Sequence, residues 1–198
     1  MPTFKFDWFS GNIPNWTKFL ERFKGKPNLV FLEIGCFEGK ATTWLLENIL
    51  TDPTSKIVTL DTFEGGMDHK DLGVEALGIP TLEARFKENL GSYIAQGQVF
   101  LYKGLSQELL RDKVTKQFKE FDFVYVDGSH VACDVLEDAI LSFRLLKKDG
   151  ILIFDDYGWT VYPQLQFNPK MGIDAFLDCF IGQYNLLLKE YQVVIQKT

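Results

Sequence analysis

Residues 121–158 constrain the fold more than any other stretch, because they alternate an apolar run, an amphipathic helix and a second apolar run. The first run, FDFVYV, ends at Asp127, and the second, GILIF, ends at Asp155 and Asp156. Two strands joined by a helix form a parallel pair. Ligands of open parallel sheets bind outside the carboxyl ends of the strands. We therefore expect three carboxylates at one sheet edge, with His130 beside them.

The same alternation continues along the chain and predicts a doubly wound α/β fold. Strands are predicted at residues 28–34, 56–60, 98–102, 121–126, 150–154, 184–190 and 192–196, and helices at residues 15–24, 40–50, 81–89, 108–120, 133–146 and 173–181. The last two strands follow each other without a helix, so they cannot both be parallel neighbours. The expected fold is a mostly parallel, seven-stranded, Rossmann-like sheet with one antiparallel strand near its edge.

A single domain is expected over residues 1–198. A chain of 198 residues is large enough for one core and too short for two ordinary domains. Within it, residues 1–27 are predicted to form an N-terminal arm and helix, and residues 28–198 the Rossmann-like core. No internal repeat, low-complexity tract or linker interrupts the sequence.

Composition argues against several classes of function. The net charge is −6 and no basic run is present, which argues against a nucleic-acid partner. The first residues lack the pattern of a signal peptide, and no apolar stretch has the length of a membrane span, so no membrane partner is expected. Cys36, Cys133 and Cys179 lie far apart without a C-x-x-C motif, so neither a disulfide framework nor a cysteine zinc site is expected. A reducing, cytoplasmic setting fits this cysteine usage.

A glycine-containing turn follows the first predicted strand. The stretch FLEIGCFEGK places Glu33 at the strand end and Gly35 and Gly39 in the turn before a helix. Glycines there allow tight turning and close backbone approach to a ligand. Phe37 stands where the dinucleotide fingerprint G-x-G-x-x-G has its middle glycine, which argues against a nicotinamide enzyme. Asp61 ends the second strand, where an acidic side chain accepts hydrogen bonds from ribose hydroxyls.

These motifs, in this order, resemble those of class I S-adenosylmethionine-dependent methyltransferases. Their first motif is an acidic residue followed by a glycine-rich turn, and their second is an acidic residue that ends the second strand. The resemblance implies that Glu33, Gly35 and Gly39 lie around the methionine part of the cofactor. It also implies that Asp61 holds the ribose. An ordinary α/β domain, in which the two glycines are plain turn residues, is the alternative.

The turn GLSQE at residues 104–108 extends the resemblance, which covers residues 28–197. It is similar to the G-x-S-Q-[DE] turn of catechol O-methyltransferase and its relatives. In those enzymes the serine and the glutamine lie by the adenine of the cofactor. The resemblance therefore implies that Ser106 and Gln107 have this position.

The pattern YVDGSH…LLKKDGILIFDDY resembles that of the sugar O-methyltransferases of macrolide and aminocoumarin biosynthesis. Those enzymes bind a divalent metal through three carboxylates at these positions. The resemblance implies that Asp127, Asp155 and Asp156 are metal ligands and that His130 is the catalytic base. Asp127 is also placed next to the cofactor. An oxygen-only ligand set suits magnesium.

Several of these residues have structural interpretations as well. In one alternative, Asp155 and Asp156 cap a following helix or turn. In another, His130 is simply a polar residue at a helix start. Asp134 either orients His130 or favours the N-terminus of the following helix. His69, in the loop after Asp61, is either solvated or catalytic.

The arm at residues 1–12 and the loops at residues 62–80 and 157–170 remain to shape an acceptor site. The aromatic side chains Tyr157, Trp159 and Tyr162 either wall this site or pack under the last strands. By resemblance, the acceptor is a hydroxyl of a sugar, a glycoside or another small polyol. The alternatives are a metal-independent methyltransferase acting on an amine or a carboxyl group, and a cofactor-binding module without catalysis. A homo-oligomer is left open.

Overall fold

The computed structural model describes residues 2–67, 73 and 78–198. Seven strands form one sheet in the order β3-β2-β1-β4-β5-β7-β6. Their bounds are β1 Val30–Ile34, β2 Lys56–Asp61, β3 Val99–Lys103, β4 Phe121–Val126, β5 Leu146–Phe154, β6 Tyr184–Lys189 and β7 Val193–Lys197. β7 runs antiparallel to both β5 and β6, whereas β1 to β5 pair in parallel. The expected Rossmann-like sheet with one antiparallel strand near its edge is confirmed.

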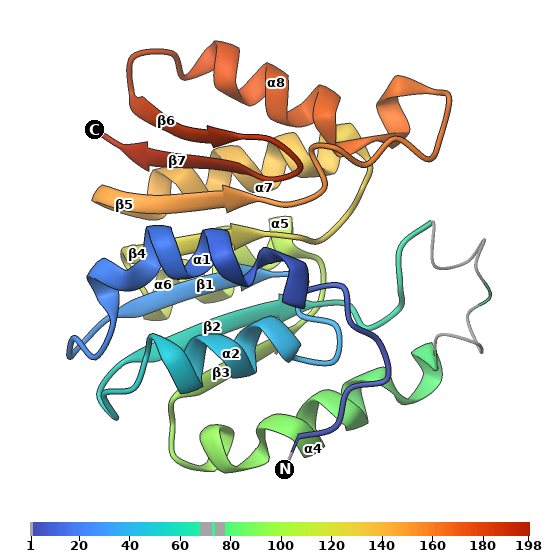
Figure 1. The fold of residues 1–198 in the computed structure, drawn as a ribbon. Helices are drawn as coiled ribbons and strands as arrows, with labels where there is room; N and C mark the ends of the chain where they lie inside the picture. The colour runs from blue at the N-terminus through green and yellow to red at the C-terminus, as the bar shows by residue number, and fades with distance from the viewer. Residues whose placement is uncertain (1, 68–72, 74–77) are drawn as a thin grey trace.

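Helices cover both faces of this sheet (Figure 1). They are α1 (Ile13–Leu20), α2 (Lys40–Asn48), α4 (Leu82–Ala95), α5 (Ser106–Leu109), α6 (Thr115–Gln117), α7 (Ala132–Leu145) and α8 (Pro169–Cys179). α1 and α2 lie in front of the sheet in Figure 1, and α7 lies behind it. The N-terminal arm, residues 2–9, runs from beside α4 to the start of α1 across the edge where the parallel strands end.

Two apolar cores lie on the two faces of the sheet. One core contains Trp16 of α1 and Phe86 of α4, and the other contains Phe143 of α7 and Phe176 of α8. Successive side chains of a strand point to opposite faces, so β4 contributes to both cores. Strands buried on both faces have near-continuous apolar sequences, which is why FDFVYV predicts a central strand.

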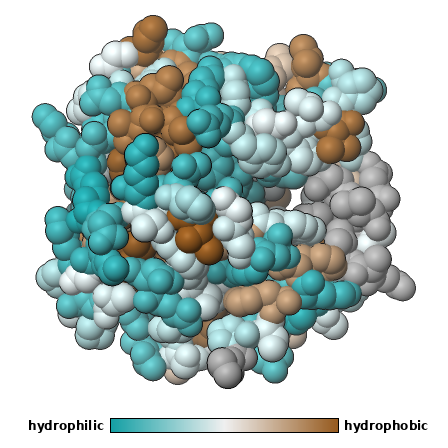
Figure 2. Space-filling view, viewed as in Figure 1, coloured by the Kyte–Doolittle hydropathy of each residue, from teal (hydrophilic) through white to brown (hydrophobic). Residues whose placement is uncertain are grey.

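Figure 2 shows apolar side chains gathered over β6 and β7, at one end of the sheet. β6 is the edge strand, and Leu186 and Leu187 are among its exposed residues. Among the residues described, no helix combines the length and apolarity that crossing a bilayer requires.

Two predicted helices differ from those observed. The helix predicted to end at residue 89 continues through Gly91 to Ala95. A glycine inside a helix costs only about 1 kcal/mol, which the buried contacts of Phe86 and Leu90 outweigh. The single helix predicted over residues 108–120 is instead α5, a π-helical turn and α6 in succession.

Two boundaries near the carboxyl end of the sheet also differ. β5 begins at Leu146 rather than at residue 150, because Leu146 already pairs with Phe121 of β4 ahead of a register shift. α8 begins at Pro169 rather than at residue 173, since the fixed φ of proline suits the first position of a helix.

Gly172 marks a close crossing of α7 and α8. A Cβ atom at Gly172 would lie 2.2 Å from the carbonyl oxygen of Ala132, whereas one at Gly91 of α4 would meet nothing within 4 Å. We predict that Gly172→Ala lowers the free energy of unfolding by about 1–3 kcal/mol through overpacking. Gly91→Ala, the matched control, should raise it by about 0.5–1 kcal/mol because alanine favours helix. Urea unfolding of both variants checks this, and a stabilised Gly172→Ala variant would contradict the close crossing.

Candidate active site

A cavity of about 720 Å³ lies at the carboxyl ends of the central strands. The sheet order reverses between β1 and β4, so this is the crevice in which open α/β sheets bind ligands. Its walls also include Phe6, Trp8 and Phe9 of the arm. The predicted site residues that line it are Glu33, Gly35, Asp61, Ser106, Gln107, Asp127, His130, Asp155 and Asp156. Gly39 is not among the lining residues.

The two glycines of the turn are required by contacts within the chain. Both have a φ of +81°, which side chains rarely adopt. A Cβ atom at Gly35 would lie 1.9 Å from the carbonyl oxygen of Asp127, and one at Gly39 would lie 2.6 Å from Leu90 Cδ1 of α4. Gly35 therefore lets β1 and β4 end side by side, and Gly39 lets α4 approach the turn.

Asp61 fixes the same turn from the neighbouring strand. Its Oδ2 accepts hydrogen bonds from the backbone N–H groups of Cys36 and Phe37, both at 2.9 Å. Its Oδ1 accepts one from the N–H of Phe63 at 2.7 Å. Hydrogen bonds to a carboxylate are stronger than neutral ones, so Asp61 orders the turn and the start of the following loop.

Glu33 is a buried acid inside the cavity wall. Its Oε2 accepts a hydrogen bond of 2.5 Å from Thr42 Oγ1 of α2. Its Oε1 is buried without a hydrogen-bond partner among the described residues. Burial, with a smaller contribution from the charge of Asp61, raises the pKa of Glu33 to about 8. An unpaired polar atom of this kind fits a donor group on a bound ligand.

Ser106 and Gln107, which are predicted to lie by the adenine, stand at the start of α5. Ser106 contacts Asp138, an acid that the sequence analysis did not identify. Ser106 Oγ donates a hydrogen bond of 2.7 Å to Asp138 Oδ1 of α7. Asp138 is 1% exposed, and burial raises its pKa to about 7. An acid on the apolar face of an amphipathic helix is the signal that could have indicated it.

A second acidic group also lines the cavity. Asp127, His130 and Asp156 each offer an atom that could bind a metal, and these atoms lie within 4.8 Å of one another. His130 Nε2 lies 2.9 Å from Asp156 Oδ2. Asp156 has a φ of +56°, which is uncommon for a residue other than glycine and often marks a functional site. Tyr191 donates a hydrogen bond of 2.7 Å to Asp156 Oδ1.

Asp155 is outside that group of three, and its carboxylate is largely occupied by protein donors. Its Oδ2 accepts hydrogen bonds from Asn12 and Gln192, both at 3.1 Å, and from the hydroxyl of Tyr125. Its Oδ1 accepts one from the N–H of Asp156 at 2.8 Å. Asp155 thus ties the start of α1 and the chain before β7 to the site, and its assignment as a metal ligand stays a prediction.

Tyr125 joins Asp155 to Asp127, because its hydroxyl also lies 2.8 Å from Asp127 Oδ2. A phenol carries one proton, so one of these two contacts needs a proton on a carboxyl group. Burial and the neighbouring carboxylates raise the pKa of Asp127 well above its usual range, and raise that of Asp155 to about 6. The crowded acids therefore retain protons or attract cations.

The aromatic loop after β5 contributes one of its three predicted side chains to the cavity. Trp159 lines the cavity, and its ring centroid lies 4.4 Å from that of His130. Tyr162 contacts Trp159 from the side at 5.5 Å, while Tyr157 donates a hydrogen bond to Asp174 of α8. Tyr157 and Tyr162 are not lining residues.

The remaining two candidates have different outcomes. Asp134 lines the cavity and accepts a hydrogen bond of 2.8 Å from Ser129 Oγ, which places it at the start of α7. Its suggested contact with His130 stays a prediction. His69 lies outside the described residues.

Comparisons with known proteins agree with this architecture. A family model described as "Methyltransferase domain" matches residues 32–157. An uncharacterised protein, R132, of Acanthamoeba polyphaga mimivirus is 27% identical over 134 residues, which cover 67% of this chain and 53% of that protein. The chain therefore spans about half the length of this relative.

Solved structures share the fold at low identity. The MycE methyltransferase of the mycinamycin biosynthetic pathway, in complex with Mg, SAH and mycinamycin VI, superimposes with a TM-score of 0.66 and 16% identity. The match covers 98% of this chain and 51% of that one. The O-methyltransferase TomG of Streptomyces achromogenes, in complex with SAM, gives a TM-score of 0.65 at 15% identity over 93% of this chain and 80% of TomG.

The family model covers more than half of the sequence, so the chain belongs to this methyltransferase domain family. The resemblance to class I methyltransferases is confirmed, since the seven-stranded order and the matched residues agree with it. The glycine turn, the ends of β2 and β4, and the paired aspartates after β5 all lie within the matched range.

Glu33 should make the stability of the ligand-free protein pH dependent. Its raised pKa means that the folded state binds this proton more tightly than the unfolded state, so stability falls as the pH rises from about 4.5 to about 8. Glu33→Gln should therefore reduce the decrease in the free energy of unfolding over this pH range by up to about 5 kcal/mol. Urea unfolding at pH 5 and pH 8 measures it. Glu47→Gln, an exposed carboxyl on α2, is the control, and an identical pH dependence in the Glu33 variant would refute the assignment.

Proposed function

We propose that this protein is an S-adenosylmethionine-dependent O-methyltransferase that transfers a methyl group to a hydroxyl of a small molecule with the help of a divalent metal, by preference Mg²⁺. One observation carries the proposal. A single cavity is lined both by the glycine turn and by the group Asp127, His130 and Asp156.

The cofactor side of the cavity supports this proposal. Glu33 presents a buried oxygen that has no partner in the described part of the chain, which suits the amino group of the methionine part. Asp61 sits at the end of β2, where the family holds the ribose. Ser106 and Gln107 also line the cavity and suit the adenine.

The side chains of Asp127, His130 and Asp156 fit a divalent metal. Carboxylate oxygens are the ligands that Mg²⁺ prefers. Asp127 and Asp156 are the residues that would hold it, and Asp155 is the third acid at this edge. Mutual repulsion contributes to the raised pKa values of Asp127 and Asp155, and a bound cation removes such repulsion. When bound, the metal supplies a Lewis acid that lowers the pKa of an acceptor hydroxyl.

The chain's own residues then handle the proton and the geometry. An alcohol has a pKa near that of water, about 15.7, and histidine about 6.5, so His130 alone cannot deprotonate it. His130 accepts the hydroxyl proton while the new O–C bond forms. Asp156 holds the imidazole at Nε2, and Trp159 packs against its ring. These contacts keep His130 on the side of the cavity that faces the acceptor.

The acceptor class is proposed by analogy and by the walls of the cavity. The MycE complex contains mycinamycin VI, and another structure with the same fold is CalS11, a calicheamicin methyltransferase, at a TM-score of 0.64 and 17% identity. Trp159 offers a flat apolar face, which suits sugar rings and other small polyols. We therefore propose a sugar, a glycoside or a small polyol.

A metal-independent methyltransferase is the second candidate, and one observation favours it. Tyr125 bridges Asp127 and Asp155 with protein hydrogen bonds alone, which satisfies these acids without a cation. Turnover that persists in the presence of a chelator would favour this second candidate.

Calorimetric titration tests the metal site. Wild type should bind S-adenosylhomocysteine and then Mg²⁺, whereas Asp127→Asn and Asp156→Asn should each retain the nucleoside and weaken Mg²⁺ binding at least about tenfold, since each removes a charged ligand. Asp178→Asn, an exposed acid on α8, is the control. Mg²⁺ binding that is equal in all four proteins, or absent from wild type, would reject the metal-dependent function. Absence of S-adenosylhomocysteine binding would reject the methyltransferase function itself.

His130→Gln separates chemistry from binding. We expect kcat to fall by about 10²–10⁴, the usual contribution of a general base. The dissociation constant for S-adenosylhomocysteine should stay within about twofold, because Gly35, Asp61 and Ser106 are untouched. Initial-rate kinetics with a panel of sugars and polyols measures the effect. A variant with unchanged kcat would leave His130 as a structural residue.

A further inference from the structure

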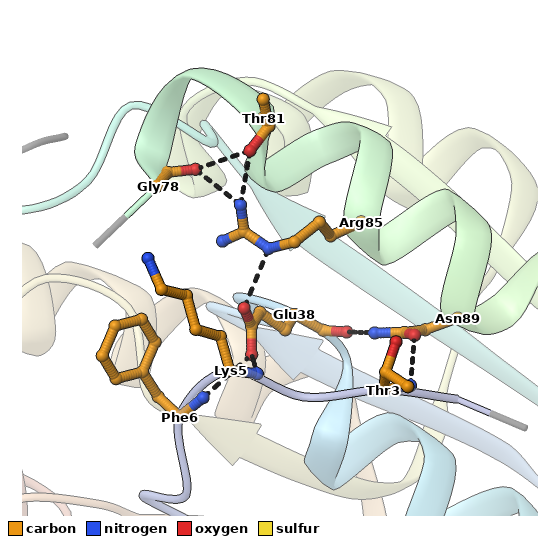
Figure 3. A network of polar contacts seen from close by, with 8 residues as sticks. All are labelled: Thr3, Lys5, Phe6, Glu38, Gly78, Thr81, Arg85 and Asn89. Carbon is orange, nitrogen blue, oxygen red and sulfur yellow. Dashed lines mark hydrogen bonds and ion pairs between the residues drawn. The ribbon is translucent and has the colours of Figure 1, made fainter. Parts of the chain in front are cut away.

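Glu38, in the glycine turn, is a buried acid that the reaction does not use. It is 1% exposed, yet its carboxylate reaches two segments far apart in sequence (Figure 3). Its Oε2 accepts hydrogen bonds from the backbone N–H groups of Lys5 and Phe6 in the arm, at 2.7 and 3.3 Å. Its Oε1 accepts one of 2.9 Å from Arg85 Nε of α4.

Arg85 extends this network to the chain before α4. Its Nη1 donates hydrogen bonds to the carbonyl oxygen of Gly78 at 2.7 Å and to Thr81 Oγ1 at 2.6 Å (Figure 3). Arg85 therefore uses separate nitrogens for Glu38 and for the Gly78–Thr81 turn. A lysine offers a single nitrogen and cannot reproduce this fork.

Asn89 adds a parallel connection one turn further along α4. Its Nδ2 donates a hydrogen bond of 3.0 Å to the carbonyl oxygen of Glu38, and its Oδ1 accepts one of 2.9 Å from the N–H of Thr3. The arm is thus attached at Thr3, Lys5 and Phe6 to the glycine turn and to α4.

These attachments bring aromatic side chains of the arm to the cofactor cavity. Phe6, Trp8 and Phe9 line it, and Trp8 lies 4.8 Å from Phe37 of the turn, between ring centroids. Phe9 packs into the core, whereas Trp8 is 54% exposed, so apolar packing alone fixes Trp8 only in part. The hydrogen bonds to the Glu38 carboxylate attach the arm at Lys5 and Phe6, and burying this side chain is costly unless its acceptors are filled.

We propose that Glu38 and Arg85 are positioning residues that hold the arm over the cofactor and thereby slow its release. They act through Phe6 and Trp8 and touch no reacting atom. The inference rests on the proposed function, because it assumes that S-adenosylmethionine and its product S-adenosylhomocysteine occupy this cavity. It assigns the arm to cofactor retention rather than to acceptor binding.

Stopped-flow displacement of S-adenosylhomocysteine, followed by tryptophan fluorescence, measures the release. In Glu38→Gln, one oxygen becomes a donor and loses either the arm or Arg85, so the dissociation rate constant should rise about tenfold. Arg85→Lys should give a smaller rise in the same direction. Asp7→Asn is the matched control: it removes the exposed ion pair of the same arm with Lys40, 2.7 Å long, and should change the rate less than about twofold.

Trypsin provides a readout of the arm itself, because cleavage after Lys5 requires the arm to leave Glu38. Mass spectrometry should detect the product beginning at Phe6 earlier in Glu38→Gln than in wild type, at equal thermal stability. S-adenosylhomocysteine should protect Lys5 in wild type. Faster release without faster cleavage would overturn the role of the arm and place the effect in the glycine turn.

The outcomes separate this inference from the proposed function. If wild type does not bind S-adenosylhomocysteine, the proposed function fails and the inference fails with it. If wild type binds, but release from Glu38→Gln and Arg85→Lys equals that from wild type, the inference alone is refuted. Thermal unfolding shows whether each variant folds. If one of the two does not fold, the release rate measured with the other variant tests the inference.

Discussion

The close, side-by-side pairing of β1 with β4 at their carboxyl ends is the constraint on which the site depends. The N–H of Asp127 donates to the carbonyl oxygen of Ile34 at 2.8 Å, and the N–H of Gly35 donates to that of Leu60 at the same distance. Any side chain at Gly35 would collide with the backbone of Asp127. Since the sheet order reverses at this point, the glycine turn and the acidic residues line one crevice together.

Burying so many acids is costly, and the chain meets this cost in different ways. Asp61 accepts backbone N–H groups on both carboxylate oxygens, whereas Glu38 accepts them on one oxygen and Arg85 on the other. These hydrogen bonds shape the turn. Glu33 has one filled oxygen and one buried oxygen without a described partner, so burial raises its pKa. The hydrogen bonds of Asp61 and Glu38 therefore support the turn, whereas Oε1 of Glu33 lies in the cavity wall without a described partner.

The sequence predicts the fold and much of the cavity because both rest on local patterns. Apolar runs that end in acids identify β1, β2, β4 and β5, and parallel pairing brings their ends together. Contacts between distant segments leave no such pattern. Nothing around Asn12 or Glu38 indicates that one meets Asp155, 143 residues away, or that the other meets Lys5. The glycine at residue 39 was predicted for approach to a ligand, yet the neighbour that requires it is Leu90.

The strand-end acids accept different numbers of hydrogen bonds from the protein, and this difference bears on where a cation would bind. Asp155 already accepts hydrogen bonds from two side-chain amides, a phenol and a backbone N–H, so its charge is largely spread over protein donors. Asp156 meets His130 and Tyr191 and faces the cavity. Under the proposed function a cation would therefore lie between Asp127 and Asp156, and an acceptor hydroxyl drawn to it would lie beside His130.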